Sequence, residues 1–165
     1  MTIQLTRDEL VCLIGHEDLT WKGLVPKVDS AEIATAATRG LAVLSVRELV
    51  SLGDGGKVTL SDKLADVLSV LNAPGDSYLV RIQIDDADDG DSMVAFALKE
   101  CATRESVTML PTPLGTMVFA IVDAEKGREA LEAMLEGVRK GQVESGASAH
   151  LVHIPANGET VTTAV

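Results

Sequence analysis

Residues 77–140 contain the feature that most constrains the fold, a series of short apolar runs followed by one long amphipathic stretch. In the first run, every second residue is apolar, namely Tyr78, Val80, Ile82 and Ile84. This period of two is typical of a strand with one buried face. Three further runs, separated by polar residues or by Pro and Gly, follow at residues 93–98, 107–110 and 116–122. The pattern predicts a four-stranded antiparallel meander.

The amphipathic stretch after Asp123 predicts one long helix, from about residue 124 to residue 140. Its apolar side chains recur at helical spacing and form one stripe, made of Ala130, Leu131, Met134, Leu135 and Val138. Charged residues occupy the opposite side, so we expect the stripe to pack on one face of the sheet. Asp123 is a residue type that caps helix N-termini, which places the start of the helix directly after it.

A second alternating segment follows the helix. His150, Val152 and Ile154 alternate with their neighbours, and this predicts a fifth strand. The tail, residues 157–165, is compatible with a weak sixth strand and also with a disordered end. The sequence leaves both readings of the tail open.

Helix-capping signals before residue 75 predict a cluster of short helices. Pairs with capping-box spacing occur at Thr6 and Glu9, at Asp29 and Glu32, and at Ser45 and Glu48, and Ser61 offers a further cap. They predict helices over residues 7–15, from about residue 30 to Gly40, from about residue 45 to Leu52, and over residues 61–72. The Gly-rich residues 53–56 predict a turn, and residues 57–60 predict a short extended segment.

Together these elements predict an α+β fold. We expect an antiparallel β-meander of about five strands, a C-terminal amphipathic helix on one face, and an N-terminal helical cluster that is winged-helix-like in order. The length of 165 residues fits a single domain over residues 1–165. Within that domain the sequence separates a helical part, residues 1–75, from a sheet-plus-helix part, residues 76–165.

Composition and charge exclude several classes of partner. The formal net charge is −11 and is spread along the chain, so no segment offers a basic footprint for nucleic acid or an anionic membrane. The N-terminal residues lack the basic and apolar regions of a signal peptide, and the longest apolar run, residues 117–122, is too short to span a bilayer. With only two cysteines, far apart in sequence, the chain is expected to be cytoplasmic.

No motif in the sequence predicts a catalytic, cofactor or metal site. The acidic run at residues 85–91 lacks two oxygen ligands that an EF-hand loop needs, so it is interpreted as a solvated hairpin tip. His150 and His153 would point to opposite faces of a strand and cannot converge on one metal. The GDGGK segment, residues 53–57, lacks the spacing of a phosphate-binding loop. We therefore expect a protein without catalytic residues, cofactor or metal, and not an enzyme.

Two other functional classes remain as alternatives. The helices at residues 30–52 and 61–72 flank a Gly-rich extended hairpin, an order compatible with a winged-helix transcription regulator that carries a ligand-sensing domain. The candidate recognition helix, however, offers Lys63 beside Asp62 and Asp66, and such a helix needs free basic side chains. An uncharacterised small α+β enzyme is the other alternative, because unrecognised sites exist on any fold.

The order of elements resembles the EspG family, the cytosolic chaperones of mycobacterial and related type VII (ESX) secretion systems. The shared phrases are Leu5, Thr6, Glu9 and Leu10 in the opening helix, Arg39-Gly40-Leu41 after an Ala-rich helix, and Leu71-Asn72-Ala73-Pro74 after a Leu-periodic helix. The resemblance covers most of residues 5–140 and implies a protein partner, namely a secreted helical-hairpin substrate of the PE/PPE or WXG type. Family members consist of two similar halves, and this chain has about the length of one.

The missing half predicts a homodimer. Apolar residues occupy consecutive positions in the later strands, so both faces of the sheet need a cover and the long helix supplies only one. A second copy related by a two-fold axis would cover the other face. The expected partner or dimer interface consists of Met93, Ala95, Met117 and Phe119. In the alternative arrangement, the N-terminal helices cover that face within one chain.

Overall fold

The computed structural model describes residues 1–165 except residues 17–18, 20, 22–27, 84–91, 102–104 and 146. The chain forms two compact units, and each is described by itself. The N-terminal unit consists of Met1–Ala73 and Thr112–Val118, and the C-terminal unit consists of Pro74–Pro111 and Phe119–Val165. The chain first crosses between units after Ala73, and the sequence analysis separated its two parts after residue 75. The acidic run at residues 85–91 lies outside the described residues.

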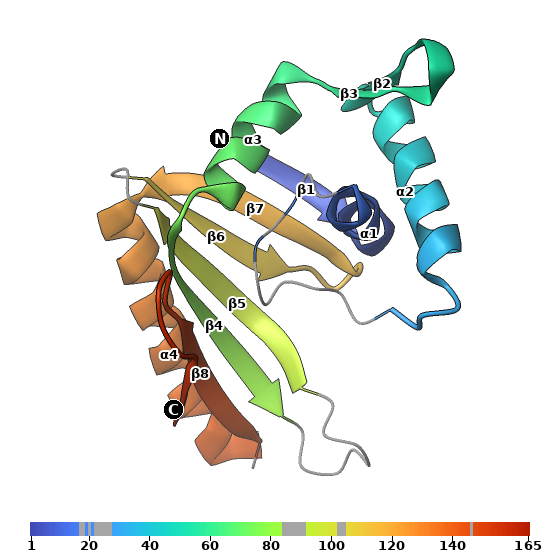
Figure 1. Ribbon diagram of the computed structural model, residues 1–165. Helices are drawn as coiled ribbons and strands as arrows, with labels where there is room; N and C mark the ends of the chain where they lie inside the picture. The colour runs from blue at the N-terminus through green and yellow to red at the C-terminus, as the bar shows by residue number, and fades with distance from the viewer. Residues whose placement is uncertain (17–18, 20, 22–27, 84–91, 102–104, 146) are drawn as a thin grey trace. The chain divides into compact units, whose positions relative to one another are not determined.

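The described residues of the N-terminal unit form three helices and a small hairpin (Figure 1). Its elements are β1 (Thr2–Thr6), α1 (Arg7–Gly15), α2 (Ile33–Val46), β2 (Val50–Leu52), the 3-10 turn η1 (Asp54–Gly56), β3 (Val58–Leu60) and α3 (Asp62–Asn72). β2 pairs with β3 in an antiparallel two-stranded sheet. The predicted turn at residues 53–56 and the extended segment after it are confirmed.

Two of the predicted helix starts are confirmed by their capping bonds. At α1, the Glu9 N–H donates to the Thr6 hydroxyl, and the Thr6 N–H donates back to the Glu9 carboxylate at 2.7 Å. At α3, the Leu64 N–H donates to the Ser61 hydroxyl at 3.3 Å. Each bond satisfies a backbone donor that the first helical turn would otherwise leave unpaired, so the local sequence sets both helix starts.

At the two other signals no capping box forms, although the helix predicted to contain Ile33 is present as α2. α2 does not stop at Gly40 but continues to Val46, and residues 50–52 form strand β2 rather than the end of a helix begun at Ser45. Gly40 lies inside α2 at the crossing with α1, where a Cβ would stand 2.0 Å from the Asp8 carbonyl oxygen. Here glycine permits close packing of two backbones rather than helix termination.

The C-terminal unit is an antiparallel sheet with one long helix. Its elements are β4 (Gly75–Gln83), β5 (Ser92–Cys101), β6 (Glu105–Pro111), most of β7 (Thr116–Asp123), α4 (Ala124–Ser145), β8 (Ser148–Ile154) and β9 (Val161–Ala164). The strand order is β1-β7-β6-β5-β4-β8-β9, and the registers of β4 with β5 and β8, of β5 with β6, and of β8 with β9 are antiparallel. The predicted α+β fold with an antiparallel meander is confirmed.

The sheet has seven strands rather than about five. The two added strands are its edges. β1 was not predicted, because its five residues run directly into the capping box of α1 and read as part of the helix start. β9 occupies the tail for which the sequence left a strand and a disordered end equally open.

The predicted apolar stripe of α4 packs on one face of this sheet. Val80, Phe96 and Leu98 are at most 2% exposed and form the centre of the contact. The stripe contacts them with Ala130, Leu131, Met134, Leu135 and Val138. Burying a large apolar side chain contributes about 1.5–3 kcal/mol, so these contacts fix α4 on the sheet.

A β-bulge in β5 changes which residues share a face. Val80 pairs with Phe96 and Arg81 pairs with Val94, so two residues of β4 are opposite three residues of β5, and the next pair is Ile82 with Met93. Val80 and Ile82 lie on the same face because they alternate in a strand, and therefore Met93 and Phe96 also share that face. The strict alternation expected for β5, which separated Met93 and Ala95 from Phe96, is wrong for Met93.

Candidate functional site

Five polar side chains gather near one end of the C-terminal unit's sheet, on the face that carries α4. This set, the Asp76 cluster, consists of Asp76, Tyr78, Glu100, Arg128 and His153. The strand registers bring four of them together, because Asp76 pairs with Glu100 and Tyr78 pairs with His153. Arg128 joins from α4 by donating to Glu100 at 2.5 Å.

The centre of the Asp76 cluster is a bonded His–Asp pair. His153 Nε2 lies 3.0 Å from Asp76 Oδ2, and the Ala156 N–H donates to Asp76 Oδ1 at 3.0 Å. The Ala156 N–H bond, followed by the bond to His153, lowers the pKa of Asp76. The rings of Tyr78 and His153 stack with centroids 4.6 Å apart and planes 3° apart. Burial raises the pKa of Tyr78, and the nearby Glu100 carboxylate adds to that rise.

An open hollow of about 410 Å³ lies beside the cluster. Its lining includes Asp76, Glu100, Cys101 and Asn157. The pKa of Cys101 is raised by burial, so the thiol stays protonated near neutral pH. A protonated thiol is a poor nucleophile, and the His–Asp pair therefore stands next to no activated nucleophile within this lining. The hollow offers carboxylate charge and hydrogen bonding, while the His–Asp pair ties β4 to β8 and to the turn after it.

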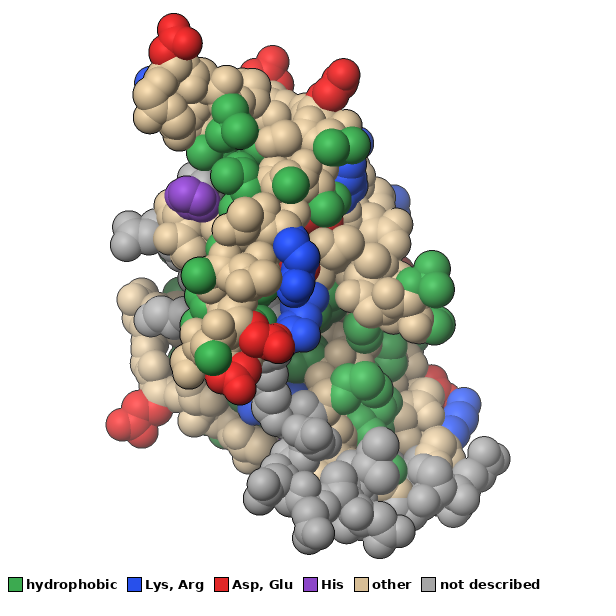
Figure 2. All heavy atoms as spheres, turned by 90° about the vertical axis from the view of Figure 1, so that its right-hand side faces the viewer, with side chains coloured by type: hydrophobic (Ala, Val, Ile, Leu, Met, Phe, Trp, Pro, Cys, Tyr) green, Lys and Arg blue, Asp and Glu red, His purple; other side chains and the backbone are tan. Residues whose placement is uncertain are grey.

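A second candidate lies in the N-terminal unit, where another hollow is lined by apolar side chains and by the polar residues Ser45, Glu48, Ser51 and Ser61. This surface, the hairpin surface, consists of Val46, Val50, Leu52 and Leu60 at the end of α2 and on the β2–β3 hairpin. The hollow measures about 420 Å³, and Val50, Leu52 and Leu60 line it. Val46 is 85% exposed and Leu52 is 57% exposed. Figure 2 shows hydrophobic side chains gathered over α2 and the hairpin.

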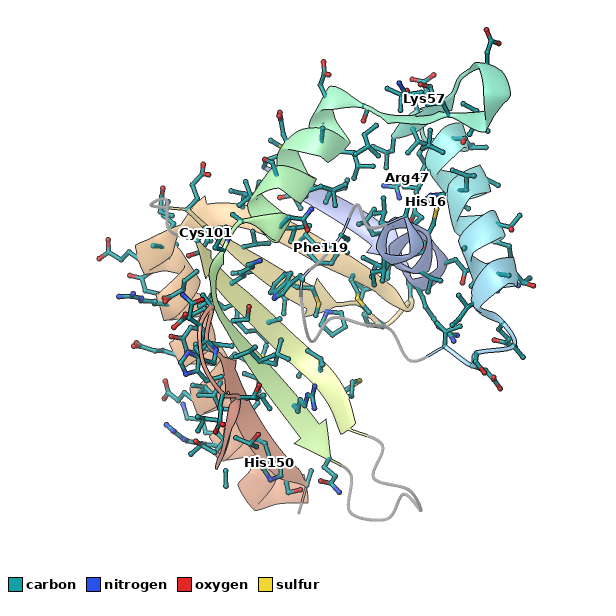
Figure 3. All side chains as sticks on the ribbon, viewed as in Figure 1. His16, Arg47, Lys57, Cys101, Phe119 and His150 are labelled. Atoms are coloured by element: carbon teal, nitrogen blue, oxygen red, sulfur yellow. The ribbon has the colours of Figure 1, made fainter. Side chains whose placement is uncertain are left out.

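An ion pair between a buried carboxylate and a partly exposed guanidinium lies at the base of the hairpin surface. The Glu9 carboxylate is fully buried, and Arg47 Nη1 donates to its Oε1 at 2.5 Å. Arg47 also donates from Nη2 to the Gln4 carbonyl at 2.8 Å, and Figure 3 shows Arg47 between α2 and α1. Glu48 then adopts φ +57°, a left-handed conformation that turns the chain from α2 into β2. The Arg47 bonds thus hold the turn from α2 into β2, which carries the hairpin surface.

The interface residues predicted from the sequence do not gather in one unit. The Met93 side chain is 56% exposed, while Ala95 and Met117 are half-buried. Phe119 is only 1% exposed. Met117 belongs to the N-terminal unit, whereas the other three belong to the C-terminal unit. The homodimer contact at these residues stays a prediction.

The described residues contain no group of three or more His, Cys, Asp and Glu side chains arranged to hold a metal. His150 and His153 occupy alternate-face positions of β8, because they pair with Arg81 and Tyr78 respectively. No helix in the described part of the chain is both long and apolar enough to cross a membrane. The Asp76 cluster was missed by sequence reasoning, since Asp76 and His153 lie 77 residues apart and only the strand register joins them.

Comparison with known proteins places this chain in no family. Neither the family models nor the curated proteins contain a match to it.

Proposed function

We propose that the protein is a non-catalytic cytoplasmic binding protein similar to EspG-type chaperones of type VII secretion. Its partner is a secreted helical-hairpin substrate of the PE/PPE or WXG type, and it acts as a homodimer. The observation that supports this proposal best is the hairpin surface, where Val46 and Leu52 expose most of their side chains on regular secondary structure.

Exposed side chains of this kind favour a protein partner. An isolated exposed Leu is ordinary, but Leu52 lines a hollow together with Val50 and Leu60, and the strongly exposed Val46 follows the lining residue Ser45 at the end of α2. An amphipathic helix buries residues at helical spacing in such a hollow, and each fully buried aliphatic side chain contributes about 1.5–3 kcal/mol. The tip of a helical hairpin has the required shape and apolar character.

A second candidate function is a winged-helix regulator, which the antiparallel β2–β3 hairpin directly before α3 favours. Against it stands the charge of α3, where the first-turn Asp62 and the later Asp66 flank Lys63. DNA recognition requires basic side chains directed at phosphates and base edges.

A binding experiment with purified components separates these functions. The chain is mixed with a soluble PE–PPE pair or a WXG-type hairpin, and association is measured by size-exclusion chromatography with light scattering. We expect a complex that Val46→Asp and Leu52→Asp weaken at least about tenfold, since each places a charge in an apolar contact. Leu114→Asp is the matched control, because Leu114 is 87% exposed and lies between β6 and β7 rather than on α2 or the β2–β3 hairpin.

Three results would count against the proposal. Failure to bind any helical-hairpin substrate removes the chaperone function, and equal weakening by all three variants removes the hairpin surface as the contact. Retention of duplex DNA that falls steeply with salt concentration would favour the regulator instead.

A further inference from the structure

Strand β9 forms an open edge of the seven-stranded sheet. It is the last strand in the order, and no strand in the described ranges pairs with its outer side. Its four residues, Val161–Ala164, are all exposed. Figure 1 marks the C-terminus beside β8, the strand with which β9 pairs. An edge of this kind presents backbone donors and acceptors to another chain.

The backbone direction of β9 follows from one bond. The Val165 N–H donates to the Ala149 carbonyl at 3.0 Å, which makes these two residues a hydrogen-bonded pair. In an antiparallel ladder, backbone groups of successive residues point alternately toward and away from the partner strand. Thr163 therefore directs its N–H and C=O toward β8, whereas Thr162 and Ala164 direct theirs outward.

β9 has the short length of many natural edge strands, four residues, but it lacks the other features that protect an edge. Natural edges carry Lys, Pro, a bulge or a covering segment. Residues 160–165 contain no charged residue and no Pro or Gly, in a chain with a net charge of −11. The register of β8 with β9 is continuous from His153–Val161 to His150–Ala164, so no bulge turns the edge away. A second copy can approach this segment without like charges meeting on the strand itself.

The sequence of the edge complements itself about Thr163. When two copies of V-T-T-A-V run antiparallel about a two-fold axis through Thr163, each Val161 meets Val165 of the other copy and each Thr162 meets Ala164. The Thr162–Ala164 pairs would be joined by the N–H and C=O groups that point away from β8. The register that matches the side chains is therefore also the register that pairs the outward backbone groups. Thr163 meets its own copy, and Thr–Thr and aliphatic cross-strand pairs are favourable.

We propose that two copies of this chain pair through β9 in this register, joining their sheets across the two-fold axis. The contact is isologous, because the same strand serves both subunits. This inference rests on the homodimer in the proposed function and gives that homodimer an interface different from the one containing Met93 and Met117.

The test uses the full chain and measures its mass and dissociation constant by light scattering and sedimentation. We expect a mass twice 17.3 kDa at micromolar concentration. Thr162→Pro removes an outward N–H and spares the ladder to β8, so the dimer dissociation constant rises roughly tenfold or more. Thr162→Val keeps that N–H and is the matched control, with an unchanged dissociation constant.

A second pair of variants keeps the test decisive if Thr162→Pro disturbs folding. Thr163→Lys places two ammonium groups opposite each other in the dimer while the exposed side chain leaves the subunit intact, and Thr163→Val is its neutral control. A parent chain that is monomeric overturns both the homodimer and its interface. A dimer that none of these variants weakens, or that only Met93→Asp weakens, overturns the β9 interface and leaves the homodimer standing.

Discussion

Arg47 lies at the end of α2 and donates to the fully buried carboxylate of Glu9, the residue that also closes the capping box of α1. One carboxylate thus serves the N-terminus of one helix and the C-terminal cap of the other. Its burial makes the two sites depend on each other, because a buried charge that loses its partner is costly.

Replacement of Arg47 by Ala should lower the free energy of unfolding by about 3 kcal/mol, since it leaves the Glu9 carboxylate buried with one backbone donor. Urea unfolding monitored by circular dichroism measures the change. Arg39→Ala is the control, because Arg39 pairs with Asp8 from a side chain that is 59% exposed. That exposed pair should contribute no more than about 1 kcal/mol. Equal losses in the two variants would show that Glu9 does not depend on Arg47.

Gly40→Ala should destabilise the protein by about 3 kcal/mol, because the new Cβ would collide with the Asp8 carbonyl carbon and oxygen at the α1–α2 crossing. Gly137→Ala in α4 is the matched control, since no atom lies within 4 Å of its added Cβ. There the substitution should stabilise by up to about 1 kcal/mol through helix propensity. A lower melting temperature for Gly40→Ala and a higher one for Gly137→Ala would confirm the close crossing of α1 and α2. A higher melting temperature for Gly40→Ala would contradict it.

The stabilising effect of Asp76 should depend on pH in a defined direction. The pKa of Asp76 is lowered from its ordinary value of 3.8 in the folded chain, so its contribution is fully present above pH 3.8. It is then lost as the pH falls through the lower folded pKa. The difference in unfolding free energy between the parent and Asp76→Asn should therefore be present near neutral pH and vanish in strong acid.

Glu136→Gln serves as the control for this pH profile. Glu136 is 68% exposed and bonds only across one helical turn to Lys140, so we expect a small difference at every pH. If the difference in unfolding free energy between the parent and Asp76→Asn grew as the pH fell, the pKa of Asp76 would be raised in the folded chain and not lowered.

Substitutions at Phe96 and Met93 should destabilise the protein unequally, although the bulge in β5 places both residues on the face of the sheet that α4 covers. Phe96→Ala should cost about 4 kcal/mol, because Phe96 is 2% exposed within the contact with α4. Met93→Ala should cost no more than about 0.5 kcal/mol, because Met93 is 56% exposed. Denaturant midpoints of the two variants provide the comparison, and similar losses would place Met93 in the core.

The sequence predicted the elements whose signals are local. The capping box at Thr6, the N-cap at Ser61, the four runs of the meander and the stripe of α4 each depend on residues close together in the chain. Gly40 misled the prediction because glycine also occurs inside a helix where another backbone packs against it, and Ser45 misled it because this residue lies in the last turn of α2 instead of capping a new helix. What a residue does in those positions depends on a neighbour that local sequence does not specify.

The bulge and the Asp76 cluster could not be predicted for a related reason. Both depend on strand register, which pairing over long sequence distances determines. Nothing near Asp76 indicates that His153 will face it, and nothing near Phe96 indicates that one extra residue will reverse the face of Met93. The interface predicted at Met93, Ala95, Met117 and Phe119 relied on perfect alternation, and the altered face of Met93 weakens that basis.

The return of Thr112–Val118 to the N-terminal unit bears on how the chain folds during synthesis. Gln4 in β1 hydrogen-bonds Thr116 in β7, a residue 112 positions later. During synthesis, β1 therefore remains without its neighbouring strand until the 112 residues that separate Gln4 from Thr116 have been made. Loop closure over such a distance is slow, and we expect completion of the N-terminal unit to be a late folding event. A fragment ending at Ala73 would lack that strand permanently.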